Sequence, residues 1–356
     1  MRKILDVTYP VYSSQTKDSG LMGYYRDYLY EDAITWTTDG ANAGTVNYRA
    51  GKFYCTNVCG VLLSDRINAS QMVAEALNNV AKGYVSYVGN PKLMNNIMAD
   101  IEIMIPVSSM EQKMISDYFA TLDRLVALHQ RKRGRLENIK KAMLEKMFPK
   151  NGADVPEIRF AGFTEAWEQR KLGEVGTTFT GLSGKKASDF GHGKASLITY
   201  MNVFSNPIAN PNMIENVEVD SRQREVEVGD VFFTTSSETP EEVGMSSVLK
   251  KKIGITYLNS FCFGFRPSVK FDLDYLAFML RSESVRKQIK LLAQGISRFN
   301  IAKTKMMYID IQVPKIDEQI AIGKYFAQLD RLITLHQRKV TLLQNIKKAC
   351  LEKMFV

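Results

Sequence analysis

Apolar residues recur at alternating steps of four and three in two stretches of the chain, which is the heptad pattern of a coiled-coil helix. The pattern is sustained for more than three heptads in residues 118–148 and again in residues 325–355. It predicts two long helices, each with a seam that packs against a partner helix. The expected seam residues are Leu122, Leu125, His129, Leu136 and Ile139 in the first stretch and Leu329, Leu332, His336, Leu343 and Ile346 in the second.

The two helical stretches are copies of each other at an offset of 207 residues, with 23 of 31 aligned positions identical. The likeness extends upstream, where residues 103–106 correspond to residues 311–314 and a Glu-Gln pair follows each. A solenoid would need three or more shorter repeats. Two long copies indicate instead an internal pseudo-two-fold duplication, equivalent to a dimer on one chain.

The middle of each seam is polar, with His129 and Lys132 in the first copy and His336 and Lys339 in the second. Polar seam residues cost stability, but they fix register and partner choice. A metal pair or an acid–base pair of histidines is the alternative, and no carboxylate or cysteine constellation accompanies them. We therefore interpret the histidines as a register device that lies near the helix crossing if the helices pair antiparallel.

The segments before the two helices differ in sequence but share a layout. Short β-rich runs punctuated by glycine occupy residues 34–64 and 230–268. A helical stretch follows at 71–81 or 275–293, and then a polar loop at 88–91 or 295–300. This layout predicts an α+β fold in which two divergent globular domains each lead into a long helix.

The expected boundaries follow from these patterns and from a Pro- and Gly-containing linker. They are a first domain at 1–107, a first helix at 108–150, the linker at 151–166, a second domain at 167–316 and a second helix at 317–356. The opening of the second domain at 167–175 has no counterpart in the first. We therefore expect the first domain to be smaller or N-terminally shortened.

Net charge is +9, and it is concentrated in the two helical segments. Residues 111–150 carry 10 basic and 5 acidic residues, and residues 317–356 carry 7 and 4. The sum favours an anionic partner, although solvated helix faces explain it equally well. No apolar run reaches the length of a membrane span, and four cysteines are too few for a secreted disulfide scaffold, so we expect a cytoplasmic protein.

Signatures of catalysis are missing from the sequence. The glycines near Lys185 and Lys194 have the wrong spacing for a phosphate-binding loop. Cys55 and Cys59 have no second pair of ligands, so structural thiols are favoured over zinc. Three histidines leave little for acid–base chemistry. We expect no catalytic residue, no metal site and no cofactor on this chain.

Together these features resemble the specificity (S) subunit of type I restriction-modification systems, over nearly all of the chain. The resemblance is carried by the duplicated Leu-Asp-Arg-Leu, Leu-His-Gln-Arg-Lys, Asn-Ile-Lys-Lys-Ala and Leu-Glu-Lys-Met-Phe segments, by the helix entries after Pro106 and Pro314, and by the Val-Pro-Glu-Ile-Arg-Phe opening at 155–160. It implies two target recognition domains separated by two long antiparallel helices. Each domain would read one half of a split site in double-stranded DNA.

The resemblance also implies partners and a division of chemistry. Two modification (M) subunits would dock on the helices and methylate adenine with S-adenosylmethionine. Two restriction (R) subunits would add translocation and cleavage driven by ATP with magnesium. Two other classes of function stay open: a coiled-coil adaptor whose heads bind proteins without DNA contact, and a stand-alone DNA methyltransferase or nuclease.

For a DNA reader, polar and basic side chains on loops are expected to contact bases and phosphates. The candidates are Ser13, Ser14, Gln15, Lys17, Thr37, Thr38, Asn42 and Lys52 in the first domain, and Lys185, Lys186, Thr235, Ser236, Ser237, Arg298, Asn300, Lys303 and Lys305 in the second. The helices would set the spacing of the half-sites, because about 30 residues span roughly 45 Å at 1.5 Å per residue and one duplex turn is about 34 Å.

Overall fold

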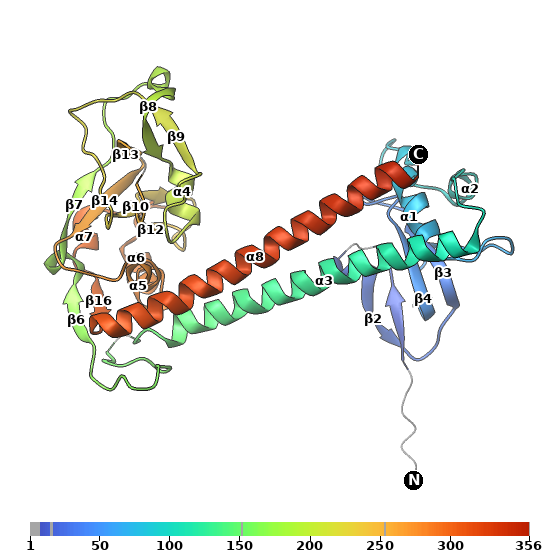
Figure 1. The fold of residues 1–356 in the computed structure, drawn as a ribbon, viewed down its shortest axis with the longest axis horizontal. Helices are drawn as coiled ribbons and strands as arrows, with labels where there is room; N and C mark the ends of the chain where they lie inside the picture. The colour runs from blue at the N-terminus through green and yellow to red at the C-terminus, as the bar shows by residue number, and fades with distance from the viewer. Residues whose placement is uncertain (1–7, 15–16, 151, 253, 356) are drawn as a thin grey trace, which may run out of the picture. The chain divides into compact units, whose positions relative to one another are not determined.

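The computed structural model describes residues 8–14, 17–150, 152–252 and 254–355 (Figure 1). The chain divides into two compact units. Unit 1 comprises Met1–Lys132 and His336–Val356, and unit 2 comprises Arg133–Leu335. Each unit therefore combines one globular head with parts of both long helices, as the α+β prediction requires.

The head of unit 1 is a five-stranded sheet in the order β2-β1-β4-β3-β5, in which only β1 and β4 pair in parallel. Its strands are β1 Tyr9–Tyr12, β2 Leu21–Tyr25, β3 Tyr30–Thr37, β4 Val46–Cys55 and β5 Cys59–Leu62. Its helices are η1 Lys17–Gly20, α1 Gln71–Val80, η2 Ala81–Tyr84 and α2 Asn95–Ala99. Helix α1, capped by the Ser70 hydroxyl, buries Met72 and Leu77 against Trp36.

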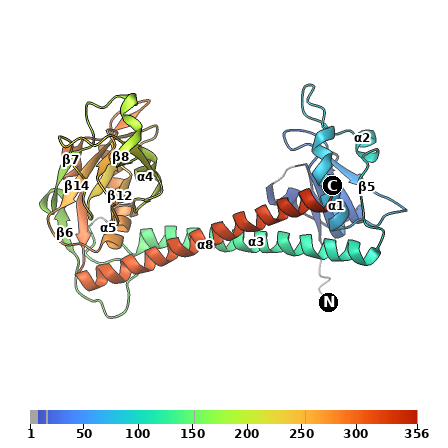
Figure 2. The ribbon, with the colours of Figure 1, turned by 45° about the horizontal axis from the view of Figure 1, so that its top comes forward.

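The head of unit 2 holds a four-stranded sheet in the order β12-β10-β14-β7 and a three-stranded sheet in the order β13-β8-β9. Strands β7, β14 and β12 of the first sheet and β8 of the second are labelled in Figure 2. Two further pairs, β16 with β6 and β11 with β15, complete it. The strands are β6 Glu168–Lys171, β7 Gly176–Thr180, β8 Phe190–Ile198, β9 Ile214–Val217, β10 Val231–Thr234, β11 Ser236–Ser237, β12 Ser246–Val248, β13 Thr256–Leu258, β14 Cys262–Pro267, β15 Phe299–Asn300 and β16 Asp310–Val313.

The helical stretch predicted at 275–293 is two helices rather than one. The helices of this head are η3 Leu172–Glu174, η4 Ala187–Asp189, α4 Tyr200–Ser205, α5 Leu273–Met279, α6 Glu283–Leu292 and α7 Lys303–Met306. The break lies at Arg281 and Ser282. Arg281 donates to the backbone carbonyls of Ser246, Val203 and Phe204, and this tertiary anchor bends the chain where the apolar pattern alone continues.

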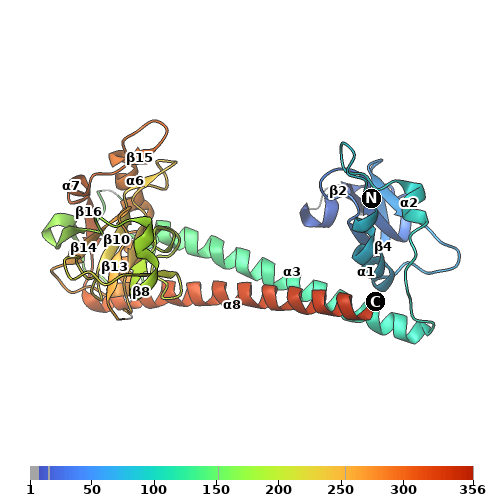
Figure 3. The same cartoon turned by 90° about the horizontal axis from the view of Figure 1, so that it is seen from above.

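The two long helices are α3 Ser109–Lys146 and α8 Ile316–Met354. Both begin in the same way, because Gln112 donates to the carbonyl of Pro106 at 2.6 Å and Gln319 donates to that of Pro314 at 2.9 Å. In each unit the two helices run antiparallel (Figure 3), since residues near the start of one contact residues near the end of the other. No described helix is long and apolar enough to cross a membrane.

Candidate nucleic-acid interface

The helix pair makes equivalent contacts in the two units. In unit 1 Phe119 stacks on Phe355, with ring centroids 6.1 Å apart. In unit 2 the residues 207 positions away, Phe326 and Phe148, stack at 5.8 Å. The duplication predicted from the repeat is therefore matched by the same local packing of aromatic rings in each unit.

The ion pairs between the helices follow the same rule. Lys347 contacts Asp123 at 2.7 Å in unit 1. Their equivalents in unit 2, Lys140 and Asp330, lie 2.5 Å apart. Lys347 also binds Glu75 on α1 at 2.6 Å, which ties the head of unit 1 to its helix end. The repeated sequence thus specifies the same surface twice.

His129 and His336 are equivalent residues of the two repeats, and their side chains contact each other. Their Nδ1 atoms are 2.9 Å apart and their ring centroids 5.1 Å. Desolvation first, and then the neighbouring His336, Lys339 and Lys132, lower the pKa of His129. In this contact one Nδ1 donates a hydrogen bond and the other Nδ1 accepts it. The accepting nitrogen must be unprotonated, so the contact favours the neutral form of the accepting histidine.

The seam departs from the predicted heptad in its middle. Lys132 and Lys339 are exposed, whereas Val340 is only 4% exposed. The seam of α8 is therefore formed by Leu332, His336 and Val340, at steps of four residues. Steps of four replace the predicted step of three because an undistorted helix drifts by about 20° per heptad relative to a 3.5-residue repeat. Of the other predicted seam residues, Leu122 and Leu329 are buried, Leu125, Leu136, Ile139, Leu332 and Leu343 are half-buried, and Ile346 is exposed.

The histidine pair makes a prediction about pH. Because the pKa of His129 is lowered in the folded chain, the unfolded chain binds more protons, so stability is lost as pH falls through about 6.5. We expect the midpoint of thermal unfolding, followed by circular dichroism, to fall between about pH 7.5 and 5.5, and to fall less in His129→Gln. The matched control is His192→Gln, since His192 is exposed and outside the seam. An equal fall in wild type and His129→Gln would contradict the assignment.

In unit 2 the fold gathers one group of the predicted DNA-contacting residues. Thr235 follows β10, and its amide and hydroxyl both donate to the carbonyl of Phe261. Ser236 and Ser237 pair with Asn300 and Phe299 through β11 and β15. Both serines are buried, and the Ser237 hydroxyl donates to Glu242. They therefore support the surface loop from beneath and are not themselves exposed for contact with DNA. The exposed members of the group are Arg298, Asn300, Lys303 and Lys305.

In unit 1 the corresponding loop follows β3. Thr37 is buried and donates to the carbonyl of Ser14, and the Thr38 hydroxyl donates to Asp39. The Thr38 carbonyl accepts from the amide of Leu93 at 2.9 Å, just as the Thr235 carbonyl accepts from Ile301 at 3.0 Å in unit 2. Asn42 is exposed on the same loop, and Ser13 is half-buried and lines a cavity together with Thr37.

Three predicted contacts lie apart from these loops. Lys52 is at the opposite end of β3 and β4 from Thr37, with its ammonium 4.4 Å from the ring centroid of Tyr28. Lys185 is bound to Asp220 at 3.1 Å, and the pKa of that carboxyl is held low by Arg222 first and by Lys185 as well. Its neighbour Lys186 is exposed. Gln15 lies outside the described residues, and only the backbone of Lys17 is described.

The sequence reasoning did not select the hairpin at 86–92 as a candidate for DNA contact. Lys92 bridges to Asp39 both through the backbone and through an ion pair of 3.5 Å, which places the hairpin beside the Thr38 loop. The hairpin at 294–300 occupies the equivalent place in unit 2. The polar loops 88–91 and 295–300 are separated along the chain by nearly the same offset as the two helices. This correspondence could have identified the first hairpin as the counterpart of the second.

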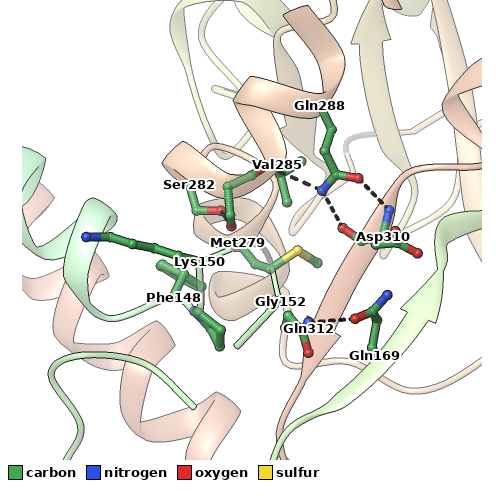
Figure 4. Close-up of a pocket in the computed structure, with 12 residues that line it drawn as sticks. Phe148, Lys150, Gly152, Gln169, Met279, Ser282, Val285, Gln288, Asp310 and Gln312 are labelled. Carbon is green, nitrogen blue, oxygen red and sulfur yellow. Dashed lines mark hydrogen bonds between the residues drawn. The ribbon is translucent and has the colours of Figure 1, made fainter. Parts of the chain in front are cut away.

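Unit 2 also contains a cavity of about 140 Å³, whose polar lining consists mainly of glutamine and serine side chains (Figure 4). Gln288 donates to the carbonyl of Asp310 and accepts from its amide, both at 2.8 Å, and Gln312 donates to Gln169 at 3.3 Å. The Gln288 amide pairs with β16, whereas Oε1 of Gln312 is buried without a hydrogen-bond partner in the described part of the chain. The cavity is lined by α5, α6, β6, β16 and the segment that follows α3. Within the described ranges no three His, Cys, Asp or Glu residues are grouped to hold a metal ion.

Comparison with known proteins identifies the family. Residues 3–138 and 164–345 match the family model described as type I restriction modification DNA specificity domain. A Mycoplasma pneumoniae protein named "Putative type I specificity subunit S.MpnORF289P N-terminus" is 40% identical over 111 residues, which is 30% of this chain and 58% of that protein. The MjaVIII type I specificity subunit of Methanocaldococcus jannaschii is 22% identical over 343 residues, covering 89% and 77%.

Solved structures share the fold. The type I restriction-modification S subunit from M. genitalium aligns over 100% of this chain and 91% of its own, with a TM-score of 0.59 and 13% identity. A chain from a study of complex assembly in the type I R-M system aligns over 98% and 91%, with a TM-score of 0.56. The matches cover 58%, 38% and 49% of the first three curated relatives, so the chain spans less than two thirds of them.

Proposed function

We propose that this chain, which belongs to the type I restriction-modification DNA specificity family, selects the DNA sequence on which a modification and restriction complex acts. Unit 1 would read one half of a split site and unit 2 the other. The paired helices would set the spacer between the halves and give each modification subunit its docking surface. The chain itself would be non-catalytic and cytoplasmic, and its partners would bind S-adenosylmethionine, ATP and magnesium.

The repetition of the helix contacts carries this proposal. The stacked pair Phe119 and Phe355 has its copy in Phe326 and Phe148, and the heads beyond these pairs differ in sheet order. An interface repeated by a two-fold relation binds two copies of one partner. Heads that differ between the units can read two different half-sites. The proposal therefore assigns the constant role to the helices and the variable role to the heads.

The charges of one segment in each head support DNA binding by both heads. The segment from 81 to 93 contains two lysines and no acidic residue, and the segment from 293 to 306 contains one arginine, two lysines and no acidic residue. Phosphate contacts of this kind supply affinity that falls with salt, and base-edge contacts supply sequence choice. We expect the loops beside Thr38 and Thr235 to make both the phosphate contacts and the base-edge contacts.

Genome-wide mapping of methylated adenine tests the function. Cells that express the chain with its modification partner are expected to gain methylation at a split sequence with a fixed spacer, and deletion of the chain is expected to remove it. The purified chain is expected to bind DNA weakly alone and tightly with the partner in gel-shift titrations. Methylation that persists at the same sites without the chain would refute the proposal.

Arg298 makes a residue-level prediction. Its side chain is exposed beside Asn300, on the hairpin that pairs with Ser236. An arginine that bonds a base edge contributes about 1–3 kcal/mol of discrimination. We expect Arg298→Ala to relax the methylated sequence at one position in one half-site, as measured by methylation mapping. Lys287→Ala, which removes an exposed charge on α6, is the control and is expected to keep the sequence. An unchanged sequence in Arg298→Ala would exclude base reading by this residue.

A further inference from the structure

Both heads carry an exposed apolar side chain at the tip of an equivalent hairpin. Val88 is 92% exposed and Ile296 is 97% exposed. The two residues are 208 positions apart, within one residue of the helix offset. Isolated exposed apolar residues are ordinary on protein surfaces. Their recurrence at one structural position in two otherwise divergent heads indicates a shared role.

The hairpins hold these side chains in matching frames. Ser86 and Lys92 exchange two backbone hydrogen bonds of 2.9 Å, and Gln294 and Asn300 exchange two of 2.9 and 2.8 Å. Each hairpin also contains a glycine at positive φ, at a different position: Gly89, at +78°, follows Val88, and Gly295, at +142°, precedes Ile296. At Gly295 a Cβ would meet the carbonyl oxygen of Arg298 at 2.0 Å, so this turn requires glycine.

The same frames fix the tips next to the candidate reading loops. Leu93 donates to the carbonyl of Thr38, and Ile301 donates to that of Thr235. Lys92 lies at the base of the first hairpin, and Arg298 lies within the second. An apolar tip with basic and no acidic residues in its own segment suits a duplex, which offers phosphates outside and apolar base faces inside. Arg298 is exposed beside the second tip, whereas the charge of Lys92 near the first tip is paired with Asp39 at 3.5 Å.

We propose that Val88 and Ile296 are wedges that insert between stacked base pairs, one in each half-site. This inference rests on the proposed DNA-reading function. Apolar wedges unstack a base step and kink the duplex by roughly 20–90°. Such a wedge would hold open the duplex around an adenine that a methyltransferase must take out of the stack. The wedge therefore couples reading by the heads to methylation by the partner.

Fluorescence of 2-aminopurine in the mapped duplex tests the wedge. The base is placed in turn at each step of both half-sites except the methylated adenine, and the duplex is bound by the chain with its modification partner. We expect fluorescence to rise at one step in each half-site because stacking is lost there. Val88→Ser is expected to abolish the rise in one half-site and Ile296→Ser in the other.

Matched controls separate the wedge from a general loss of apolar surface. Val107→Ser and Leu291→Ser remove exposed side chains, 102% and 84% accessible, that lie outside the hairpins, and both are expected to keep the rise. Because all four side chains are exposed, thermal unfolding is expected to be unchanged. A 2-aminopurine at the methylated adenine reports whether each complex still assembles and extrudes its target.

The outcomes distinguish the wedge from the function beneath it. If no sequence-specific methylation depends on the chain, the DNA-reading proposal fails. If the site is bound but no step unstacks, or if Val88→Ser and Ile296→Ser unstack it as wild type does, the wedge is overturned while DNA reading stands. A loss of preference for thymine without any change in stacking would assign the tips to methyl contacts in the major groove and would also overturn the wedge.

Discussion

Inserting three heptads into both long helices is expected to keep both half-sites and to lengthen the spacer between them by about nine base pairs. The insertions are three copies of residues 126–132 after Lys132 and three copies of residues 333–339 after Lys339, which are equivalent positions in the repeat. Each insertion adds 21 residues, or about 32 Å at 1.5 Å per residue. One duplex turn is about 34–36 Å, so the second half-site returns to nearly the same face of the DNA.

A single-heptad insertion in both helices is the matched control. It adds about 10 Å, or about three base pairs, and turns the second half-site by about a third of a turn. We expect methylation to be much weaker with this insertion than with three heptads, although the added length is smaller. Methylation mapping reads both outcomes. An unchanged spacer after the three-heptad insertion would show that the helices do not measure the distance.

Truncating Phe326 is expected to destabilise unit 2 by about 3–5 kcal/mol, the range for a buried phenylalanine replaced by alanine. Its side chain is fully buried and contacts Phe148 and Phe278, with ring centroids 5.8 and 5.1 Å away. The equivalent substitution in unit 1 is Phe119→Ala, because Phe119 is also fully buried and stacks on Phe355. Each substitution removes the ring that joins a head to its helix pair.

Hydrogen exchange of backbone amides measures where the stability is lost. In Phe326→Ala we expect faster exchange in β10 and α5, with β3 and α1 unchanged, and the reverse in Phe119→Ala. Leu342→Ala is the control, since Leu342 lies on α8 and is 59% exposed. Faster exchange across both heads in either variant would mean that the two units do not open independently.

The long helices could be predicted from sequence because their signal is local and repeated. A seam of apolar residues every three or four positions specifies a helix whatever surrounds it, and 23 identities at an offset of 207 reveal the duplication. The middle of the seam was predicted less well. Val340 lies there in place of Lys339, because the phase of a helix depends on its twist as well as on its residue pattern.

The surface of the heads was predicted only in part. Polar residue type and loop position selected the segments around Thr38 and Thr235, and Arg298 and Asn300 beside the latter, and DNA contact by these residues stays a prediction. The same criteria also selected Lys52 and Lys185, which the fold engages elsewhere, the first over Tyr28 and the second with Asp220. A lysine on a loop has the same sequence signature whether its charge is paired or free.

The sequence by itself determined that this protein is a duplication with two long helices, two unlike α+β heads and membership of a DNA specificity family. Periodicity, identity at a fixed offset and short motifs are properties of the chain that survive without coordinates. Only the tertiary structure brought His129 and His336, which the sequence places near the crossing of an antiparallel pair, to a contact of 2.9 Å. Only the tertiary structure decided that Arg281 divides one predicted helix into two, and that the hairpins at 86–92 and 294–300 hold apolar tips beside the candidate reading loops. These are contacts between residues far apart in the chain, and their energies depend on distances that no local pattern encodes.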